Sequence, residues 1–173
     1  MTLSQRGYSR YASILLLTLT GDRRSPPPSG SEPSFRIDDY PVGDWIDVLN
    51  TSPRDGDASG DLRMIARVQQ PSAFVTAYLG AEPVGIGRAV ADGDWTGVFH
   101  MVTVPHARGR GVARLVLTAA AHWAQSVDAH QMYLQVERSN TLARRLYASA
   151  GFECLAEYHY RARSMPGLSP RPR

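Results

Sequence analysis

A chain of 173 residues can bury one hydrophobic core and scarcely two, and its single cysteine excludes an internal disulfide and suits a reducing compartment. The net charge of +3 is unevenly distributed along the chain. Residues 1–100 contain nine arginines and twelve acidic residues, whereas residues 101–173 contain ten arginines and four acidic residues. All basic residues are arginine, and they neither form a run nor alternate with aromatic residues, so no nucleic-acid partner is predicted.

The N-terminal segment is predicted to precede the folded domain. Residues 12–19 are apolar, but the stretch is too short to span a bilayer and no small-residue cleavage site follows it, so no membrane partner is expected. A strand remnant or an over-extended start explains it better. Residues 25–33 are rich in proline and serine. We therefore predict a disordered or linker segment over 1–34 and one domain over 35–173.

Apolar periodicity and turn residues predict the elements of that domain. Pro71 ends the second helix, and Gly-containing turns separate the first strands. The predicted elements are helices over 42–49 and 62–68, antiparallel strands over 73–79, 84–91 and 95–104, a helix from 112, a strand over 131–136, a short helix over 140–150 and a strand over 152–163. The helix from 112 crosses over to the next strand, which implies a parallel neighbour.

The stretch from Val102 to Ala113 predicts an anion-binding turn. An apolar strand runs through Gly109 and Gly111 directly into an amphipathic helix. Glycines let the backbone approach a ligand closely, and the first amide groups of a helix lack intrahelical partners. The chain has no lysine, which excludes a Walker A loop, and two glycines this late in the chain fit a dinucleotide fingerprint poorly.

Two motifs carry a resemblance to a known superfamily. Arg108 to Ala113 matches R-x-x-G-x-G/A, and the run from Leu134 through Asn140, Tyr147 and Phe152 matches a strand followed by N-x-x-A-x-x-L-Y-x-x-x-G-F. Both resemble the GNAT superfamily of acyl-coenzyme A N-acyltransferases, most of all its branch of ribosomal-protein-alanine, protein N-terminal and small-amine acetyltransferases.

The resemblance implies a fold and a set of coenzyme contacts. The fold is of the α/β (α+β) class, a mixed and mostly antiparallel sheet of about 6–7 strands with about 4 helices, in which the strands before the loop and before Asn140 splay apart. The acyl-pantetheine arm of acetyl-CoA would enter this gap and pair with the backbone like an added strand. The implied coenzyme-binding residues are Met101, Val102, Thr103, Arg108, Gly109, Arg110, Gly111, Val112, Ala113, Arg114, Asn140 and Tyr147. Asn140 could also cap the helix that follows it, a role that does not exclude the coenzyme contact.

The implied chemistry is direct attack of an amine on the thioester, with Tyr147 at the position of the family's general acid. Gln135 departs from the family pattern, because protein N-terminal acetyltransferases have a glutamate there and an amide cannot accept a proton. Glu137, on the same face of the strand, and His100 are the candidate bases. Glu137 could instead pair with Arg138 or Arg145. A water relay could replace both bases, and an amine that is already neutral would need neither.

The acceptor is expected to be a small amine or a peptide N-terminus. Seven carboxylates surround the first helices and favour a cationic acceptor, although helix starts and solvated loops also explain them. They are Asp38, Asp39, Asp44, Asp47, Asp55, Asp57 and Asp61. Cys154 is expected to be a small buried group, and no metal site is expected.

These features together predict a cytoplasmic, bacterial acetyl-CoA-dependent N-acetyltransferase that is a monomer or homodimer. The alternatives are a catalytically silent acyl-CoA-binding regulatory module, or a domain detached from a longer polypeptide with residues 1–33 as the remainder.

Overall fold

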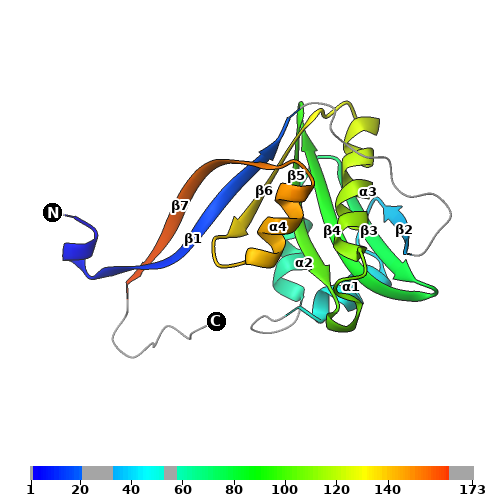
Figure 1. Ribbon diagram of the computed structural model, residues 1–173, viewed down its shortest axis with the longest axis horizontal. Coiled ribbons are helices and arrows are strands. Elements are labelled where there is room, and N and C mark those ends of the chain that lie inside the picture. The colour runs from blue at the N-terminus through cyan, green and yellow to red at the C-terminus, as the bar shows by residue number, and fades with distance from the viewer. Residues whose placement is uncertain (1, 21–32, 53–57, 164–173) are drawn as a thin grey trace.

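The computed structural model describes residues 2–20, 33–52 and 58–163. In these residues a seven-stranded sheet in the order β2-β3-β4-β5-β6-β1-β7 is flanked by four α-helices (Figure 1). The elements are η1 (Ser4–Arg6), β1 (Tyr8–Leu19), β2 (Ser34–Asp38), α1 (Gly43–Asn50), α2 (Ser59–Ile65), β3 (Ser72–Leu79), β4 (Glu82–Asp92), β5 (Trp95–Thr103), η2 (Pro105–Ala107), α3 (Val112–Ser126), β6 (Gln131–Glu137), α4 (Thr141–Ser149) and β7 (Glu153–Arg163). The predicted fold class is confirmed.

One strand pair in the sheet is parallel. Residues Trp95 to Val98 of β5 pair with Gln131 to Leu134 of β6, whereas the other neighbours are antiparallel. Short turns join β3 to β4 and β4 to β5, while α3 carries the chain across from β5 to β6, as a parallel pair requires. This crossover confirms the predicted parallel neighbour.

Helix α3 lies close against β4 because two glycines face it. A Cβ atom at Gly85 would lie 2.3 Å from Cγ1 of Val112, and one at Gly87 would lie 2.5 Å from Cγ1 of Val116. Val112 and Val116 are buried. This contact fixes where α3 begins, and therefore where the loop before it lies.

Helix α1 covers the opposite face of the sheet. Phe74 of β3 is paired with Arg88 of β4, the residue after Gly87, and successive side chains of a strand point to opposite faces. The ring of Trp45 from α1 packs on Phe74 at 5.2 Å between centroids. The indole N–H of Trp45 also donates a hydrogen bond to the carbonyl of Gly87 at 3.2 Å.

Gly85→Ala is expected to destabilise the fold by about 1–3 kcal/mol, because the new methyl would collide with the buried Val112 side chain. The matched control is Gly60→Ala in the exposed helix α2, where only the end of Arg63 lies within 4.0 Å and where alanine favours the helix. Urea unfolding checks both variants. Equal midpoints for Gly85→Ala and the wild type would contradict the close approach of α3 to β4.

The prediction of a linker over 1–34 is wrong for residues 8–19. These residues form β1, which pairs with both β6 and β7, and its C-terminal half from Ile14 onward contributes four buried side chains to the core. The apolar run is too short to be recognised by itself, and only pairing with strands far along the chain gives its backbone groups partners. Residues 21–32, which include most of the proposed proline-rich linker, lie outside the described part. Strand β2, at the opposite edge of the sheet, was not predicted.

Strand β7 is an edge strand, and β1 and β7 together extend away from the rest of the molecule (Figure 1). No side chain of β7 is fully buried. The expectation that Cys154 is buried is therefore wrong, since its side chain lies on this uncovered strand and is exposed.

Candidate active site

The predicted anion-binding turn lies between β5 and α3. After η2, Gly109 has φ +76° and Gly111 has φ +80°, a left-handed conformation that L side chains adopt only with strain. Gly111 is the N-cap of α3, and no side chain caps this helix. The first intrahelical bond is from the N–H of Leu115 to Gly111, so the three preceding amide groups have no acceptor within the helix.

Three arginines surround this helix start. Arg108 and Arg110 are exposed, and neither forms an ion pair with a residue that the structure describes. Arg114 donates to the hydroxyl of Ser149 at 2.7 Å, which joins the first turn of α3 to the end of α4. The loop therefore combines free amide groups with uncompensated positive charge, as an anion site requires.

The parallel strands separate next to this loop. Pairing ends at Val98 of β5 and Leu134 of β6, although both strands continue, to Thr103 and Glu137. Beyond that point β5 stays paired with β4 as far as Thr103, so only its edge toward β6 is unpaired. This edge of β5 is therefore open to pairing with an added extended chain.

A β-bulge at His100 marks the point of separation. Phe99 is paired with Arg88 and Val102 with Ile86, so β5 has one residue more than β4 over this interval. His100 has φ +51°, which is unusual for a residue other than glycine. The bulge turns β5 away from β6 and allows the His100 side chain to lie on the α1 and α2 face.

His100 contacts both helices of that face. Its ring packs edge-on against Trp45 of α1 at 5.8 Å between centroids, and its Nε2 lies 3.9 Å from Oδ1 of Asp61 of α2. The His100 side chain is only 16% exposed. A titratable imidazole is thus held against a carboxylate where the two strands part.

The second candidate base is more exposed. Gln135 and Glu137 alternate with buried Leu134 and Val136, so both point away from the α3 side of the sheet. Glu137 accepts a hydrogen bond from the hydroxyl of Ser139 at 3.3 Å. The alternative in which Glu137 pairs with Arg138 is not found, because Arg138 pairs with Glu157 instead.

Asn140 and Tyr147 belong to α4. The Asn140 side chain accepts a hydrogen bond from the N–H of Ala143 at 3.1 Å, which confirms the capping role. Tyr147 is 6% exposed and packs against Phe152. Burial raises the pKa of the Tyr147 phenol above its ordinary value, so the hydroxyl keeps its proton throughout the neutral range.

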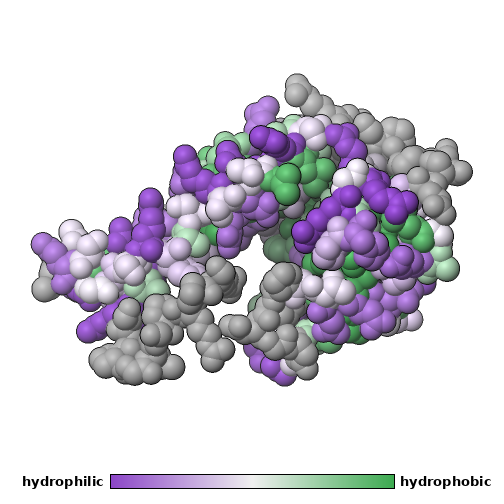
Figure 2. All heavy atoms as spheres, turned by 60° about the horizontal axis from the view of Figure 1, so that its bottom comes forward, coloured by the Kyte–Doolittle hydropathy of each residue, from purple (hydrophilic) through white to green (hydrophobic). Residues whose placement is uncertain are grey.

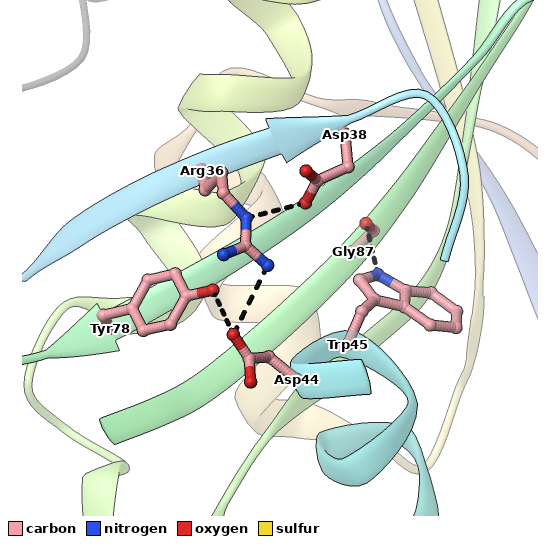
Figure 3. Close-up of polar contacts among 6 residues, drawn as sticks. All are labelled: Arg36, Asp38, Asp44, Trp45, Tyr78 and Gly87. Atoms are coloured by element: carbon pink, nitrogen blue, oxygen red, sulfur yellow. Dashed lines mark hydrogen bonds and ion pairs between the residues drawn. The ribbon is translucent and has the colours of Figure 1, made fainter. Parts of the chain in front are cut away.

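The aspartates before and within α1 are partly neutralised. Arg36 of β2 contacts the carboxylate of Asp38 at 2.9 Å and that of Asp44 at 3.3 Å, and the Tyr78 hydroxyl donates to Asp44 at 2.8 Å (Figure 3). Tyr78 was not singled out from the sequence, because nothing local pairs it with a residue 34 positions away. The predicted carboxylate cluster is therefore in part an internal network. Asp55 and Asp57 lie outside the described residues.

Removal of the Tyr78 hydroxyl should give a pH-dependent loss of stability. Burial and the hydrogen bond to Asp44 raise the pKa of Tyr78 to about 12. The folded state thus favours the neutral phenol, and its contribution is complete below the unfolded pKa of about 10 and disappears as the pH rises toward 12. Tyr78→Phe should cost about 1 kcal/mol at neutral pH, and this cost should fall steadily as the pH rises above about 10. Urea unfolding of both proteins at several pH values checks this, and a difference independent of pH would contradict it.

Figure 2 shows a hollow between the part of the molecule that carries β1 and β7 and the rest of it. Among the described residues, no three His, Cys, Asp or Glu side chains are grouped as metal ligands. None of the described helices is both long enough and apolar enough to cross a membrane.

A sheet with one splayed parallel pair beside a helix that begins at a glycine and has no side-chain cap is the arrangement that the resemblance to the GNAT superfamily implies. Comparison with known families agrees, since residues 38–152 match the acetyltransferase (GNAT) family. The chain belongs to this family.

The relatives are mostly longer proteins. The chain is 35% identical over 132 residues to an uncharacterized N-acetyltransferase, YobR, of Bacillus subtilis. The aligned region covers 74% of this chain and 53% of the relative. It thus spans about half the length of this curated relative. Its fold resembles a GCN5-related N-acetyltransferase from Kribbella flavida, with TM-score 0.69, 18% identity and coverage of 92% of this chain and 61% of that one. It also resembles the aminoglycoside acetyltransferase AAC(6')-Iy, solved with a CoA-S-monomethyl-acetylneamine bisubstrate analogue, with TM-score 0.63, 19% identity and coverage of 78% and 100%.

Proposed function

We propose that this chain transfers an acetyl group from acetyl-CoA to a primary amine, either a small amine or a peptide N-terminus. The observation that carries the proposal is the unpaired β6-facing edge of β5 from Phe99 to Thr103, which leads directly to the free amide groups at the start of α3. A ligand with an extended amide-bearing arm joined to a pyrophosphate fits this arrangement from end to end.

Each part of the coenzyme has a counterpart in the chain. The backbone of Met101, Val102 and Thr103 would pair with the pantetheine arm. The amide groups of Val112, Ala113 and Arg114 and the exposed side chains of Arg108 and Arg110 would bind the phosphates. The Asn140 amide nitrogen, which does not take part in the helix cap, would donate to the arm.

Tyr147 is the proposed general acid. Its protonated hydroxyl would hydrogen-bond to the thioester sulfur and stabilise the thiolate that leaves as the tetrahedral intermediate collapses. A phenol whose pKa is raised by burial retains the proton that this role needs.

His100 is the better placed of the two candidate bases. It lies at the bulge where the strands part and is only 16% exposed, with Asp61 at 3.9 Å to stabilise the imidazolium after proton transfer. Glu137 lies three residues beyond the last residue of β6 that pairs with β5, and its side chain is exposed. The carboxylate of Asp61 also favours a cationic acceptor on this face.

His100→Gln is expected to lower kcat/KM for the amine about tenfold, since water can accept the proton less effectively in its place. The limb of the pH profile that reports deprotonation of the base should disappear with it. The matched variant is Glu137→Gln, which should change kcat/KM less than twofold. Steady-state thiol release measured against pH checks both. If Glu137→Gln causes the tenfold loss and His100→Gln changes kcat/KM less than twofold, Glu137 is the base.

Calorimetric titration with acetyl-CoA and with desulfo-CoA, followed by thiol release with a panel of amines, tests the proposed function. Micromolar binding of both ligands and thiol release with at least one amine are expected. Lack of binding would overturn the proposal. Binding without turnover of any polyamine, amino acid or peptide would favour the alternative, a catalytically silent acyl-CoA-binding regulatory module. The observation that supports this alternative is that Gln135 occupies the position where related enzymes have a glutamate.

A further inference from the structure

A surface pocket of about 540 Å³ lies away from the proposed acetyl-transfer site. It is bounded by the segment before α1, the segment between α2 and β3, and the end of α3. No residue of β5, β6, α4 or the loop of Arg108 to Arg114 lines it. Its volume lies in the range of pockets that hold small molecules.

The pocket contains a buried arginine without an acidic partner. Arg88 is 5% exposed, and it forms no ion pair with any residue in the described part of the chain. Its guanidinium donates to the Ser72 hydroxyl at 3.1 Å and lies over the Phe74 ring at 5.3 Å. Its Nε atom is buried without an acceptor.

An arginine in this state is costly for the fold. Buried charged groups are normally paired, and a guanidinium has five N–H donors arranged to match a carboxylate. Burial lowers the pKa of Arg88, in keeping with a charge that no nearby carboxylate stabilises. An anion within the pocket would supply the missing acceptors.

The remaining walls of the pocket define the rest of the ligand. Most of them are apolar or aromatic: Tyr40, Pro41, Ile65, Ala66, Val68, Pro71, Phe74, Trp123 and Val127. The polar lining residues besides Arg88 are Asp39, Gln70 and Ser72. Asp39 is the one carboxylate in the lining, and it would repel an anion that carried more charge than Arg88 neutralises.

We propose that this pocket binds a small organic carboxylate with an apolar body, whose carboxylate pairs with Arg88 and whose body packs against Phe74 and Trp123. A bidentate pair between a guanidinium and a carboxylate provides both the affinity and the orientation. The site is separate from the coenzyme site, and its occupation does not depend on the proposed acetyl transfer.

Phenylacetate and its neutral analogue phenylacetamide test the proposal on the wild-type protein without acetyl-CoA. The chain has three tryptophans, so a ¹H–¹⁵N spectrum contains three indole signals, and Trp123→Phe assigns the relevant one. Phenylacetate should shift the Trp123 signal saturably and leave that of Trp95 unchanged, whereas phenylacetamide should bind at least tenfold more weakly. Absence of a saturable shift below about 10 mM would overturn the proposal, and so would equal binding of the two compounds.

Two arginine variants locate the charge that is responsible. Arg88→Met should weaken phenylacetate binding at least tenfold, whereas Arg36→Met should leave it unchanged. Arg36 is a matched control because its guanidinium also lies over an aromatic ring, at 5.5 Å from the Tyr78 centroid, but it already contacts two carboxylates. Undiminished binding by a folded Arg88→Met protein would overturn the assignment. Tighter binding of inorganic phosphate than of phenylacetate would overturn the proposal that the ligand has an apolar body. The comparison of phenylacetate with phenylacetamide remains decisive if Arg88→Met does not fold.

Discussion

Tyr147→Phe should lower kcat about a hundredfold while leaving the dissociation constant of acetyl-CoA within twofold of the wild-type value. The substitution removes the only proton donor that we propose for the leaving thiolate. The buried ring and its packing against Phe152 are retained. Steady-state kinetics and calorimetric titration measure the two quantities separately.

The control for this prediction is Tyr78→Phe. Tyr78 also has a raised pKa, but its hydroxyl contacts Asp44 on the α1 side, and its loss should leave kcat unchanged. An unchanged kcat in Tyr147→Phe would show that Tyr147 is a packing residue and that the thiolate leaves without an acid. Equal losses of kcat in both variants would point to a general loss of structure.

Gly111→Val should weaken acetyl-CoA binding about thirtyfold, since a non-glycine residue with positive φ costs about 2 kcal/mol. No heavy atom outside its immediate chain neighbours lies within 4 Å of the Cβ position at Gly111, so the effect is one of backbone conformation and not of a collision with the protein. The unliganded loop would relax to another conformation, and binding would have to restore the one that directs the amide groups of α3 at the phosphates. Calorimetric titration measures the change.

Gly93→Val provides the matched control. Gly93, in the turn between β4 and β5, has φ +59° and equally open surroundings, but it lies far from the loop in the chain. Gly93→Val should lose stability but not affinity, whereas Gly111→Val should lose affinity for acetyl-CoA. If Gly111→Val binds acetyl-CoA as tightly as Gly93→Val does, the proposed phosphate site is wrong.

Local signals in the sequence predicted most of the fold after residue 42 and the glycine-containing turn before α3. The glycines before Val112 need a left-handed backbone, and the apolar periodicity after them needs a helix, so the turn and the free amide groups follow from residues adjacent in the chain. Asn140 likewise caps the helix that begins immediately after it. The crossover through α3 made β6 a parallel neighbour of β5.

The residues that we propose to act on the acceptor amine are brought together by contacts between positions far apart in the chain. Neither the bulge that turns His100 toward Asp61 nor the pairing of Arg138 with Glu157 is visible in any short stretch of sequence. Arg88 gave one overlooked signal, because a charged residue inside the apolar stretch of β4 requires a reason.

The sequence by itself determined which segments from residue 42 onward become helices and strands and where the glycine-containing turn before α3 lies, because periodicity, glycine conformation and helix capping act within a few residues. Tertiary structure alone decided that residues 8–19 are an inner strand between β6 and β7 and that Cys154 is exposed at an edge. It also decided which carboxylate lies beside His100. Strand order, burial and the partner of each charge depend on long-range pairing, which a linear pattern does not specify.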